Sequence, residues 1–272
     1  MTAKLAVFGN PVAHSLSPVI HGLFGELAGI DLHYAKRLVP RDDFAAAARD
    51  FFADGGMGIN ITVPFKIDAY DFVDIRSALA EDAGAVNTIV RQRDGLLRGE
   101  NTDGGGLVAD LLFNLGWSLE GKSILILGAG GAVQGVLRSL LDQAPSQIII
   151  ANRTYENAVK LVKMAKNDHV QARRLDELLE PFDIIISGSS AGLGRSNETM
   201  SLPATLLTAT TCVYDMIYGV ETPFLRWAKD LPASQKADGL GMLVEQAAIA
   251  FELWFDVKVE TRSVLDQLRK QS

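Results

Sequence analysis

Polar side chains of several chemical kinds recur where apolar segments of the first hundred residues end. In an α/β protein, ligands gather beyond the carboxyl ends of the strands, so side chains at these ends are candidate ligand contacts. A set of hydroxyl, amide, amine and carboxylate groups suits a small polyhydroxylated acid. The candidates are Ser15, Ser17, Asn60, Thr62, Lys66, Asn87 and Asp103. Each also has a plainer explanation, since Ser17 and Asp103 are equally suited to capping helices.

Lys66 follows a strand that stops at Pro64, which places it in the first turn of the next helix. The positive end of a helix dipole disfavours a protonated amine, and burial has the same effect. Both effects favour proton transfer by Lys66 near neutral pH. The alternative is a solvated surface lysine, which is the common fate of this residue type.

A glycine-rich turn, Gly128-Ala129-Gly130-Gly131-Ala132, joins a buried strand to a helix. Glycines here allow backbone N–H groups to approach a pyrophosphate, whose charge the helix N-terminus attracts. Val133 stands at the third glycine of the usual G-x-G-x-x-G pattern. With a strand before it and a helix after it, the turn predicts a dinucleotide site rather than a plain connection.

The second strand of this region ends at Asn152-Arg153-Thr154. An NAD site usually has Asp or Glu here, which accepts a hydrogen bond from the ribose 2′-hydroxyl. Arg153 instead offers a guanidinium that can pair with a 2′-phosphate, so the sequence favours NADP. The alternatives are a surface arginine at Arg153 and a simple helix cap at Thr154.

The elements that position these residues alternate short apolar runs with amphipathic stretches, which predicts an α/β fold. We expect strands at 5–8, 34–39, 57–63, 85–91, 96–99, 147–151, 183–186 and 211–216, and one from Ser123. We expect helices at 17–28 (capped by Ser17), 42–52, after Pro64, 107–115, 240–255 and 261–269. The strands after Ser123 fit a doubly wound parallel sheet. A composition break at residues 101–106 marks the junction of two domains.

The composition excludes several classes of protein. The chain has 272 residues, 48% hydrophobic and 22% charged, with a net charge of −7, which is ordinary globular usage without a nucleic-acid surface. No apolar stretch reaches the roughly 18 residues that span a bilayer, and the N-terminus does not resemble a signal peptide. A single cysteine, Cys212, points to a reducing, cytoplasmic compartment. No metal site is expected, because the histidines lack metal-ligand spacing: His14, His21, His33 and His169.

The order of these motifs resembles that of shikimate dehydrogenase, the NADP-dependent enzyme family of the shikimate (chorismate) pathway of aromatic amino acid biosynthesis. The resemblance runs nearly end to end. The matching segments are FGNPVAHSLSP (8–18), NITVPFK (60–66), GAVNT (84–88), NTDG (101–104), GAGGA (128–132), NRT (152–154), YDMIY (214–218), TPFL (222–225) and ADGLGMLV (237–244).

The resemblance implies an oxidoreductase that reduces 3-dehydroshikimate reversibly to shikimate with NADPH. It implies that Lys66 and Asp103 form the catalytic pair and that Ser15 and Ser17 hold the substrate carboxylate. The other implied substrate contacts are Asn60, Thr62, Asn87, Tyr218 and Gln246. The implied cofactor contacts are Gly128, Ala129, Gly130, Gly131, Ala132, Asn152, Arg153, Thr154, Gly239 and Met242.

The implied fold has three parts: a substrate-binding catalytic domain (1–103), a Rossmann NADP-binding domain (104–238) and C-terminal helices (239–272) that return to the first domain. The resemblance places the active site in the cleft between the domains. Glycines 104–106 and Gly239 suggest hinges that let the domains close on the substrate.

The resemblance is incomplete at three places near the cofactor. Asn157 stands where NADP-using members often have a second arginine, which leaves Arg153 alone to hold the 2′-phosphate and weakens the preference for NADP. The loop Ser187-Gly-Ser-Ser-Ala-Gly192 replaces the usual Asn-Ala-Thr-Ser-x-Gly. Val133 replaces a smaller residue and is expected to tighten the pyrophosphate turn.

Three other interpretations are weighed against this one. A quinate/shikimate dehydrogenase using NAD or both cofactors should have an acidic residue near Arg153, and none is present at the end of that strand. A non-catalytic regulatory module should have lost Lys66 or Asp103. A folate-type dehydrogenase leaves the serine pair unexplained. The expected partner is a small-molecule substrate, with no nucleic acid or membrane, for a monomer or homodimer.

Overall fold

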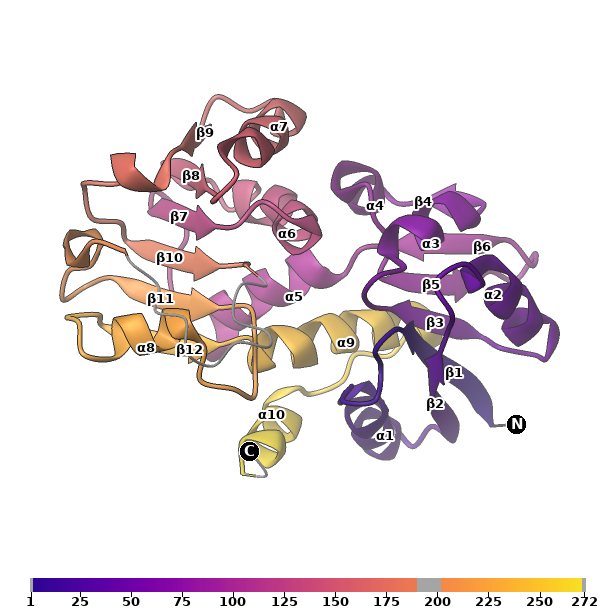
Figure 1. Cartoon of the computed structure of the whole chain (residues 1–272). Helices are drawn as coiled ribbons and strands as arrows, with labels where there is room; N and C mark the ends of the chain where they lie inside the picture. Colours follow the sequence, from indigo (N-terminus) through magenta and orange to yellow (C-terminus); the bar gives the residue numbers. More distant parts are fainter. Residues whose placement is uncertain (1, 190–201, 271–272) are drawn as a thin grey trace. The chain divides into compact units, whose positions relative to one another are not determined.

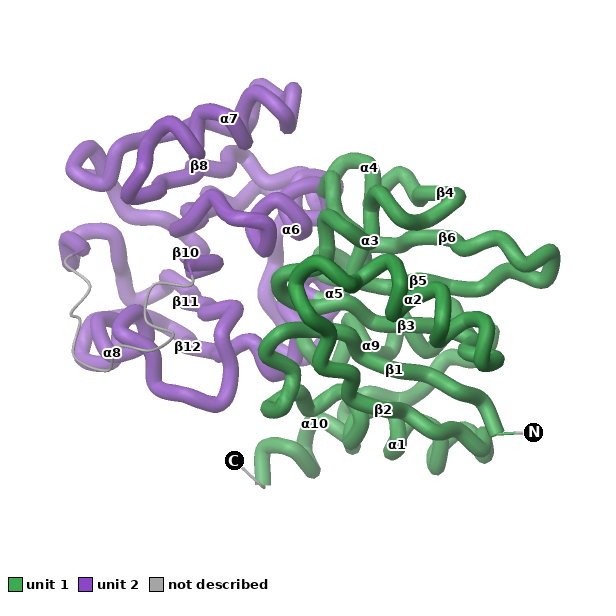
Figure 2. Tube along the Cα trace, turned by 45° about the vertical axis from the view of Figure 1, so that its right-hand side comes forward, with its two compact units in different colours: residues 1–106, 243–272 green, residues 107–242 purple. Residues whose placement is uncertain are grey.

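The computed structural model describes residues 2–189 and 202–270, which divide between two compact units (Figure 2). Unit 1 comprises residues 1–106 and 243–272, and unit 2 comprises residues 107–242. Among the described residues, no helix has the length and apolar character needed to cross a membrane.

The sheet of unit 1 has six strands in the order β2-β1-β3-β5-β6-β4 (Figure 1). They are β1 (Ala3–Gly9), β2 (Leu32–Leu38), β3 (Gly58–Ile61), β4 (Ile75–Arg76), β5 (Thr88–Arg91) and β6 (Leu97–Glu100). β1 lies parallel to β2 and β3, whereas β5 runs antiparallel to β3 and β6. The register pairs Thr88 with both Asn60 and Glu100, so the end of β3, the start of β5 and the end of β6 share one sheet edge.

Side chains of β1 alternate between the two faces of this sheet, as the period of a strand requires. Ala6 and Phe8 join the core beneath α2 (Phe44–Ala53) and α3 (Lys66–Phe72). Leu5 and Val7 pack in a second cluster with Trp254 of α9 (Leu240–Phe255). The other helices with residues in unit 1 are α1 (Ser17–Ala28), α4 (Ala78–Ala83), α5 (Asp103–Ala109) and α10 (Arg262–Arg269).

Among the described residues, the sheet of unit 2 has six parallel strands in the order β12-β11-β10-β7-β8-β9 (Figure 1). They are β7 (Ser123–Leu127), β8 (Gln147–Ala151), β9 (Val170–Arg173), β10 (Ile184–Ser187), β11 (Cys212–Asp215) and β12 (Gln235–Asp238). Chain order reverses direction at β7 and β10, which is the doubly wound arrangement that binds dinucleotides at its switch point.

Both faces of this second sheet are covered. Ile124 and Ile126 of β7 pack with α6 (Gly131–Leu141) and α7 (Tyr155–Ala165), whereas Leu125 and Leu127 pack with α8 (Pro223–Lys229). Within the described part of the unit there are also three short helical turns: η1 (Asp110–Asn114), η2 (Leu175–Glu177) and η3 (Ala204–Leu206).

One expected detail of α1 is wrong. Ser17 is its first helical residue rather than its N-cap, because the carbonyl of Leu16 already accepts the first backbone hydrogen bonds from Val19 and Ile20. The side chain that acts here is Ser15, whose Oγ accepts the Ser17 N–H at 3.3 Å. The two serines are therefore locked to each other.

Candidate active site

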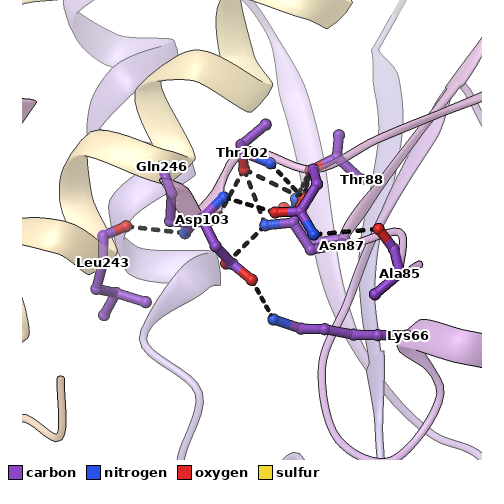
Figure 3. A network of polar contacts seen from close by, with 10 residues as sticks. Lys66, Ala85, Asn87, Thr88, Thr102, Asp103, Leu243 and Gln246 are labelled. Carbon is purple, nitrogen blue, oxygen red and sulfur yellow. Dashed lines mark hydrogen bonds and ion pairs between the residues drawn. The ribbon is translucent and has the colours of Figure 1, made fainter. Parts of the chain in front are cut away.

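Lys66 and Asp103 meet at the shared edge of the unit 1 sheet. Lys66 begins α3, which follows β3, and Asp103 begins α5, which follows β6. Lys66 Nζ lies 2.5 Å from Asp103 Oδ2 (Figure 3). The side chains keep 27% and 12% of their surface exposed, so the pair remains open to a ligand. An accessible amine held against a carboxylate can hold or pass on a proton of a bound molecule.

Asn87 fixes the orientation of the Asp103 carboxylate from the other side (Figure 3). The Asn87 side chain is buried, and its Nδ2 donates to Asp103 Oδ1 at 2.8 Å and to Thr102 Oγ1 at 2.9 Å. Its Oδ1 accepts the backbone N–H of Thr102 at 2.9 Å. Because a backbone N–H can only donate, this bond determines which end of the amide faces Asp103.

The hydrogen bonds continue away from Asp103 through three more side chains. Thr88 Oγ1 donates to Asn87 Oδ1 at 3.0 Å and accepts from Asn60 Nδ2 at 3.0 Å. Asn60 Oδ1 in turn accepts from the Tyr34 hydroxyl at 2.6 Å. Since Thr88 has one hydrogen to donate, its bond to Asn87 forces Asn60 to present its Nδ2 to Thr88 and its Oδ1 to Tyr34.

Gln246 enters this network from α9. Thr102 Oγ1 lies 3.3 Å from Gln246 Oε1, and Gln246 Nε2 donates to the carbonyl of Leu243 at 2.8 Å (Figure 3). A Cβ at Gly106 would lie 2.6 Å from both the backbone nitrogen and the Cβ of Gln246. Only glycine permits this approach of α5 to α9, which brings Gln246 to Thr102.

An aromatic cluster lies behind Tyr34. The His21 ring is fully buried and stacks on Tyr34 with centroids 4.5 Å apart, and Trp254 lies 5.2 Å away. Burial lowers the pKa of His21 to about 3, against a smaller opposing effect of the nearby Asn60 side chain. Neither ring nitrogen meets the geometry of a hydrogen bond with a described residue. Burial also raises the pKa of Tyr34 well above its usual value, against an opposing contact with Ser17. Both rings are therefore neutral near pH 7.

Ser15, Ser17 and Thr62 supply hydroxyls at the ends of β1 and β3. Ser15 Oγ donates to Ser17 Oγ at 3.1 Å, so the two hydroxyls lie side by side, and Ser17 also contacts the Tyr34 side chain. The Thr62 methyl group would be 2.4 Å from a Cβ at Gly9, so Gly9 makes room for it. The Thr62 hydroxyl has no hydrogen bond among the described residues, which leaves it free for a ligand.

The glycine turn of unit 2 follows β7, at the switch point of the sheet. Gly128 has φ +116°, a conformation that side chains disfavour, and a Cβ there would crowd the backbone of Gly188 at 3.1 Å. A Cβ at Gly130 or Gly131 would meet nothing within 4 Å. Ala129 and Ala132 complete the turn, and α6 starts at Gly131. The turn thus combines a tight bend with free space beside the first N–H groups of a helix.

Val133 does not constrict this turn from the solvent side, because its side chain is fully buried in the core of unit 2. The Val133 side chain lies close to the loop after β10, because a Cβ at Gly188 would lie 2.5 Å from Val133 Cγ2. Residues 190–192 of that loop lie outside the described residues.

The end of β8 presents Asn152, Arg153 and Thr154. Asn152 Nδ2 donates to the carbonyl of Thr154 at 2.8 Å. Thr154 occupies the N-cap position of α7, but its side chain makes no capping hydrogen bond. Arg153 is exposed and has no hydrogen bond or ion pair with any described residue, and Asn157 is exposed one turn along. The guanidinium is therefore available to an anion.

The remaining expected site residues of unit 2 lie after β11 and β12. Tyr218 is half-buried in the turn after β11, and burial raises the pKa of its hydroxyl. Gly239 follows β12, where a Cβ would lie 2.3 Å from the carbonyl oxygen of Met216. Met242 packs into the hydrophobic core of the unit. No group of histidine, cysteine or carboxylate side chains suited to a metal ion occurs among the described residues.

Sequence reasoning missed Tyr34, Thr88 and Thr102 as parts of the site. Thr88 and Thr102 each follow an asparagine in a quoted motif, which was a usable signal. Tyr34 gave none, since its position in β2 reads as ordinary core.

Comparison with known proteins assigns these features to one family. The pattern described as "Shikimate dehydrogenase substrate binding domain" matches residues 7–89, that of "Shikimate / quinate 5-dehydrogenase" matches 109–202, and that of "Shikimate 5'-dehydrogenase C-terminal domain" matches 239–269. A shikimate dehydrogenase (NADP(+)) of Cellvibrio japonicus is 51% identical, over 100% of this chain and 98% of that protein.

Solved structures agree in fold along the whole chain. The Ael1 enzyme of Pseudomonas putida superposes with a TM-score of 0.92 at 40% identity, covering 98% of both chains. The Thermus thermophilus shikimate 5-dehydrogenase in complex with NADP(H) and shikimate has a TM-score of 0.87 at 31% identity, covering 99% of both. The predicted α/β fold class is confirmed. The chain belongs to the shikimate dehydrogenase family, as its motifs predict.

Proposed function

We propose that this chain catalyses the NADP-linked, reversible reduction of 3-dehydroshikimate to shikimate, with Lys66 and Asp103 as its catalytic residues. The observation that carries the residue assignment is the 2.5 Å contact between Lys66 Nζ and Asp103 Oδ2. The contact lies at a sheet edge rich in hydroxyl and amide groups, as a polyhydroxylated acid requires. The NADP-dependent activity of the 51% identical relative supports the reaction.

Oxidation of a ring alcohol requires that one hydrogen leave carbon as hydride and that the hydroxyl proton go to a base. NADP supplies the hydride acceptor when it is bound. Lys66 Nζ takes or relays the hydroxyl proton. Asp103 holds Lys66 and the substrate hydroxyl in register, and Asn87 holds Asp103, so the carboxylate contributes by orientation.

Substrate binding is assigned to the side chains around this pair. The adjacent hydroxyls of Ser15 and Ser17 are suited to the substrate carboxylate. Thr62 has an unused hydroxyl, and Asn60, Asn87 and Gln246 present amides whose orientations their neighbours fix. Hydrogen bonds to ring hydroxyls select a cyclic polyol acid over apolar analogues.

The residues of unit 2 fit NADP. Space beside Gly130 and Gly131 leaves the first N–H groups of α6 accessible to a pyrophosphate. Asn152, Arg153 and Thr154 include no carboxylate that would repel a 2′-phosphate, and the Arg153 guanidinium is unpaired among the described residues. These residues would hold the cofactor's phosphates.

Substitution of Lys66 tests the catalytic assignment. Lys66→Ala should lower kcat by roughly 100- to 10,000-fold, because it removes the proton-transfer group, while the Kd for NADP⁺ stays within about twofold. The control is Lys4→Ala, which removes an exposed lysine paired with Asp54 at 3.1 Å in the same unit. Near-normal turnover of Lys66→Ala would remove Lys66 from the mechanism.

The substrate and cofactor are tested by absorbance of the reduced nicotinamide in four reactions, shikimate or quinate with NADP⁺ or NAD⁺. Fast reduction with shikimate and NADP⁺ alone supports the proposal. Comparable rates with quinate or NAD⁺ would move the chain to the broader quinate/shikimate group.

The proposed setting is the cytoplasm, where the enzyme acts as a monomer or homodimer. The lone cysteine, Cys212, is half-buried and has no disulfide partner in the sequence, which supports a reducing compartment. Cell fractionation tests the compartment, and light scattering of the purified chain tests the oligomeric state.

A further inference from the structure

A second arginine lies at the strand edge where Arg153 is found. β9 runs parallel to β8 in a register that pairs Arg173 with Ala151, the last residues of the two strands. Arg174 follows β9 at the edge where Asn152 and Arg153 follow β8. Residues after neighbouring parallel strands emerge side by side, so the two arginines flank the same end of the sheet.

Tyr155 ties the Arg174 side chain to this place. The Arg174 Cζ lies 4.6 Å from the centroid of the Tyr155 ring, which is the first residue of α7 and only two positions after Arg153. A guanidinium that lies over an aromatic face keeps its N–H groups in its own plane, where they can still donate to another acceptor. The stack therefore holds Arg174 at the start of α7 without consuming its donors.

No described residue neutralises this guanidinium. Only the backbone of Arg174 forms hydrogen bonds with described residues: its N–H donates to the Glu177 carboxylate at 3.0 Å, and its carbonyl accepts the Glu177 N–H at 3.1 Å. Its neighbour differs, since the Arg173 side chain is ion-paired with Glu180, whose pKa that contact lowers. Of two adjacent arginines, one is committed to a carboxylate and the other is available.

We propose that Arg174 is the second guanidinium for the 2′-phosphate of NADP, beside Arg153. The inference rests on the proposed role of the β8 end as the 2′-phosphate site. Two guanidiniums offer bidentate, charge-assisted bonds to one phosphate, and the first N–H groups of α7 add to them. This region also contains carboxylates that repel a phosphate, so two cations hold the phosphate better than one. They are Glu156, Asp176 and Glu177.

The test separates the phosphate from the rest of the nucleotide. Binding of adenosine 2′,5′-bisphosphate and of adenosine 5′-monophosphate to the full chain is measured by calorimetry. Arg174→Ala should weaken the bisphosphate about 10- to 100-fold and the monophosphate less than about threefold, as expected for bonds to a charged group. Arg173→Ala is the matched control and should leave both affinities within about threefold. Tyr155→Leu should weaken the bisphosphate alone, by a smaller factor, because the guanidinium loses its support.

Each other result has a distinct meaning. If Arg153→Ala weakens the bisphosphate and Arg174→Ala does not, the inference is wrong and the proposed site stands on Arg153 alone. If neither variant changes bisphosphate binding, both the inference about Arg174 and the proposed 2′-phosphate site are wrong. Equal weakening of both probes by Arg174→Ala would show that Arg174 contacts the adenosine, and would also overturn the assignment. Circular dichroism confirms that each variant is folded.

Discussion

The polar groups at the sheet edge of unit 1 and those at the sheet edge of unit 2 are held in different ways. In unit 1, Asn60, Asn87 and Thr88 are buried, and each forms hydrogen bonds with other side chains of the network. In unit 2, Arg153 and Arg174 are exposed, and neither guanidinium forms a hydrogen bond or ion pair with a described residue.

The difference follows the tasks proposed for the two edges. Proton transfer needs atoms placed to within a fraction of an ångström, and interlocked amides provide that placement before the substrate arrives. Recognition of a phosphate needs charge and free donors, which bonds within the protein would consume. Buried side chains that form hydrogen bonds with one another therefore suit the proposed catalytic edge, and exposed guanidiniums suit the proposed anion-binding edge.

Acid should destabilise unit 1 through the buried His21. The unfolded chain protonates His21 below its ordinary pKa of 6.5, whereas the folded chain does so only near 3. The folded-state pKa is lowered, so the stabilising contribution is complete above pH 6.5 and is lost progressively as pH falls towards 3. At pH 4.5 the loss is about 3 kcal/mol.

Urea unfolding at pH 7 and pH 4.5 measures this loss. His21→Phe keeps a ring in the aromatic cluster and should lose about 3 kcal/mol less than the natural chain on acidification. The exposed His33, on the neighbouring strand position to Tyr34, provides the control, and His33→Phe should retain the full acid sensitivity. Equal losses in all three proteins would show that His21 protonation does not limit acid stability.

Much of the fold could be predicted because its elements are long or apolar. The strand at 147–151 and the helix at 240–255 match β8 and α9 to the residue, since one is a buried branched run and the other a long apolar stretch. β4, β9 and β12 escaped prediction. β4 has two residues, and β12 has the sequence Gln-Lys-Ala-Asp, so tertiary pairing rather than local pattern makes them strands.

The site was predictable where side chains occur in motifs and unpredictable where they act on other side chains. Lys66, Asp103 and Asn87 belong to motifs, and they lie in contact. Tyr34 acts through Asn60, and Arg174 depends on the register of β9 against β8. Neither relation leaves a spacing signal in the sequence, because both depend on which strands lie side by side.

Substitution of Gly130 can block the glycine turn of unit 2 without disturbing the fold. Its φ of −92° is allowed for alanine, and a Cβ there meets no protein atom within 4 Å. Gly130→Ala should therefore leave the melting temperature within about 2 °C, yet weaken NADP⁺ binding roughly 10- to 100-fold by crowding the pyrophosphate.

Gly22→Ala is the matched control for Gly130→Ala, because a Cβ at Gly22 also meets nothing within 4 Å but lies on α1. Its Kd for NADP⁺, measured by calorimetry, should match that of the natural chain. Unchanged NADP⁺ binding in Gly130→Ala would show that the glycine turn does not hold the cofactor.

The smallest expected effect tests whether the interlocked network positions the catalytic edge or only stabilises it. Thr88→Val keeps the shape of the side chain but removes the hydroxyl that joins Asn60 to Asn87. The Asn60 amide then loses an acceptor and its fixed orientation. The KM for shikimate should rise about five- to tenfold, while the KM for NADP⁺ stays unchanged.

Thr211→Val separates positioning from stability. Thr211 is as deeply buried as Thr88, and its hydroxyl donates to the carbonyl of Phe182 at 2.7 Å within unit 2. Both variants should lose about 1–3 kcal/mol of stability, because each leaves a buried polar group unsatisfied. Only Thr88→Val should raise the KM for shikimate, and Thr88→Ser should restore it. Identical kinetics in the two valine variants would reduce the network to a structural role, and the contrast between the two sheet edges would then be one of burial alone.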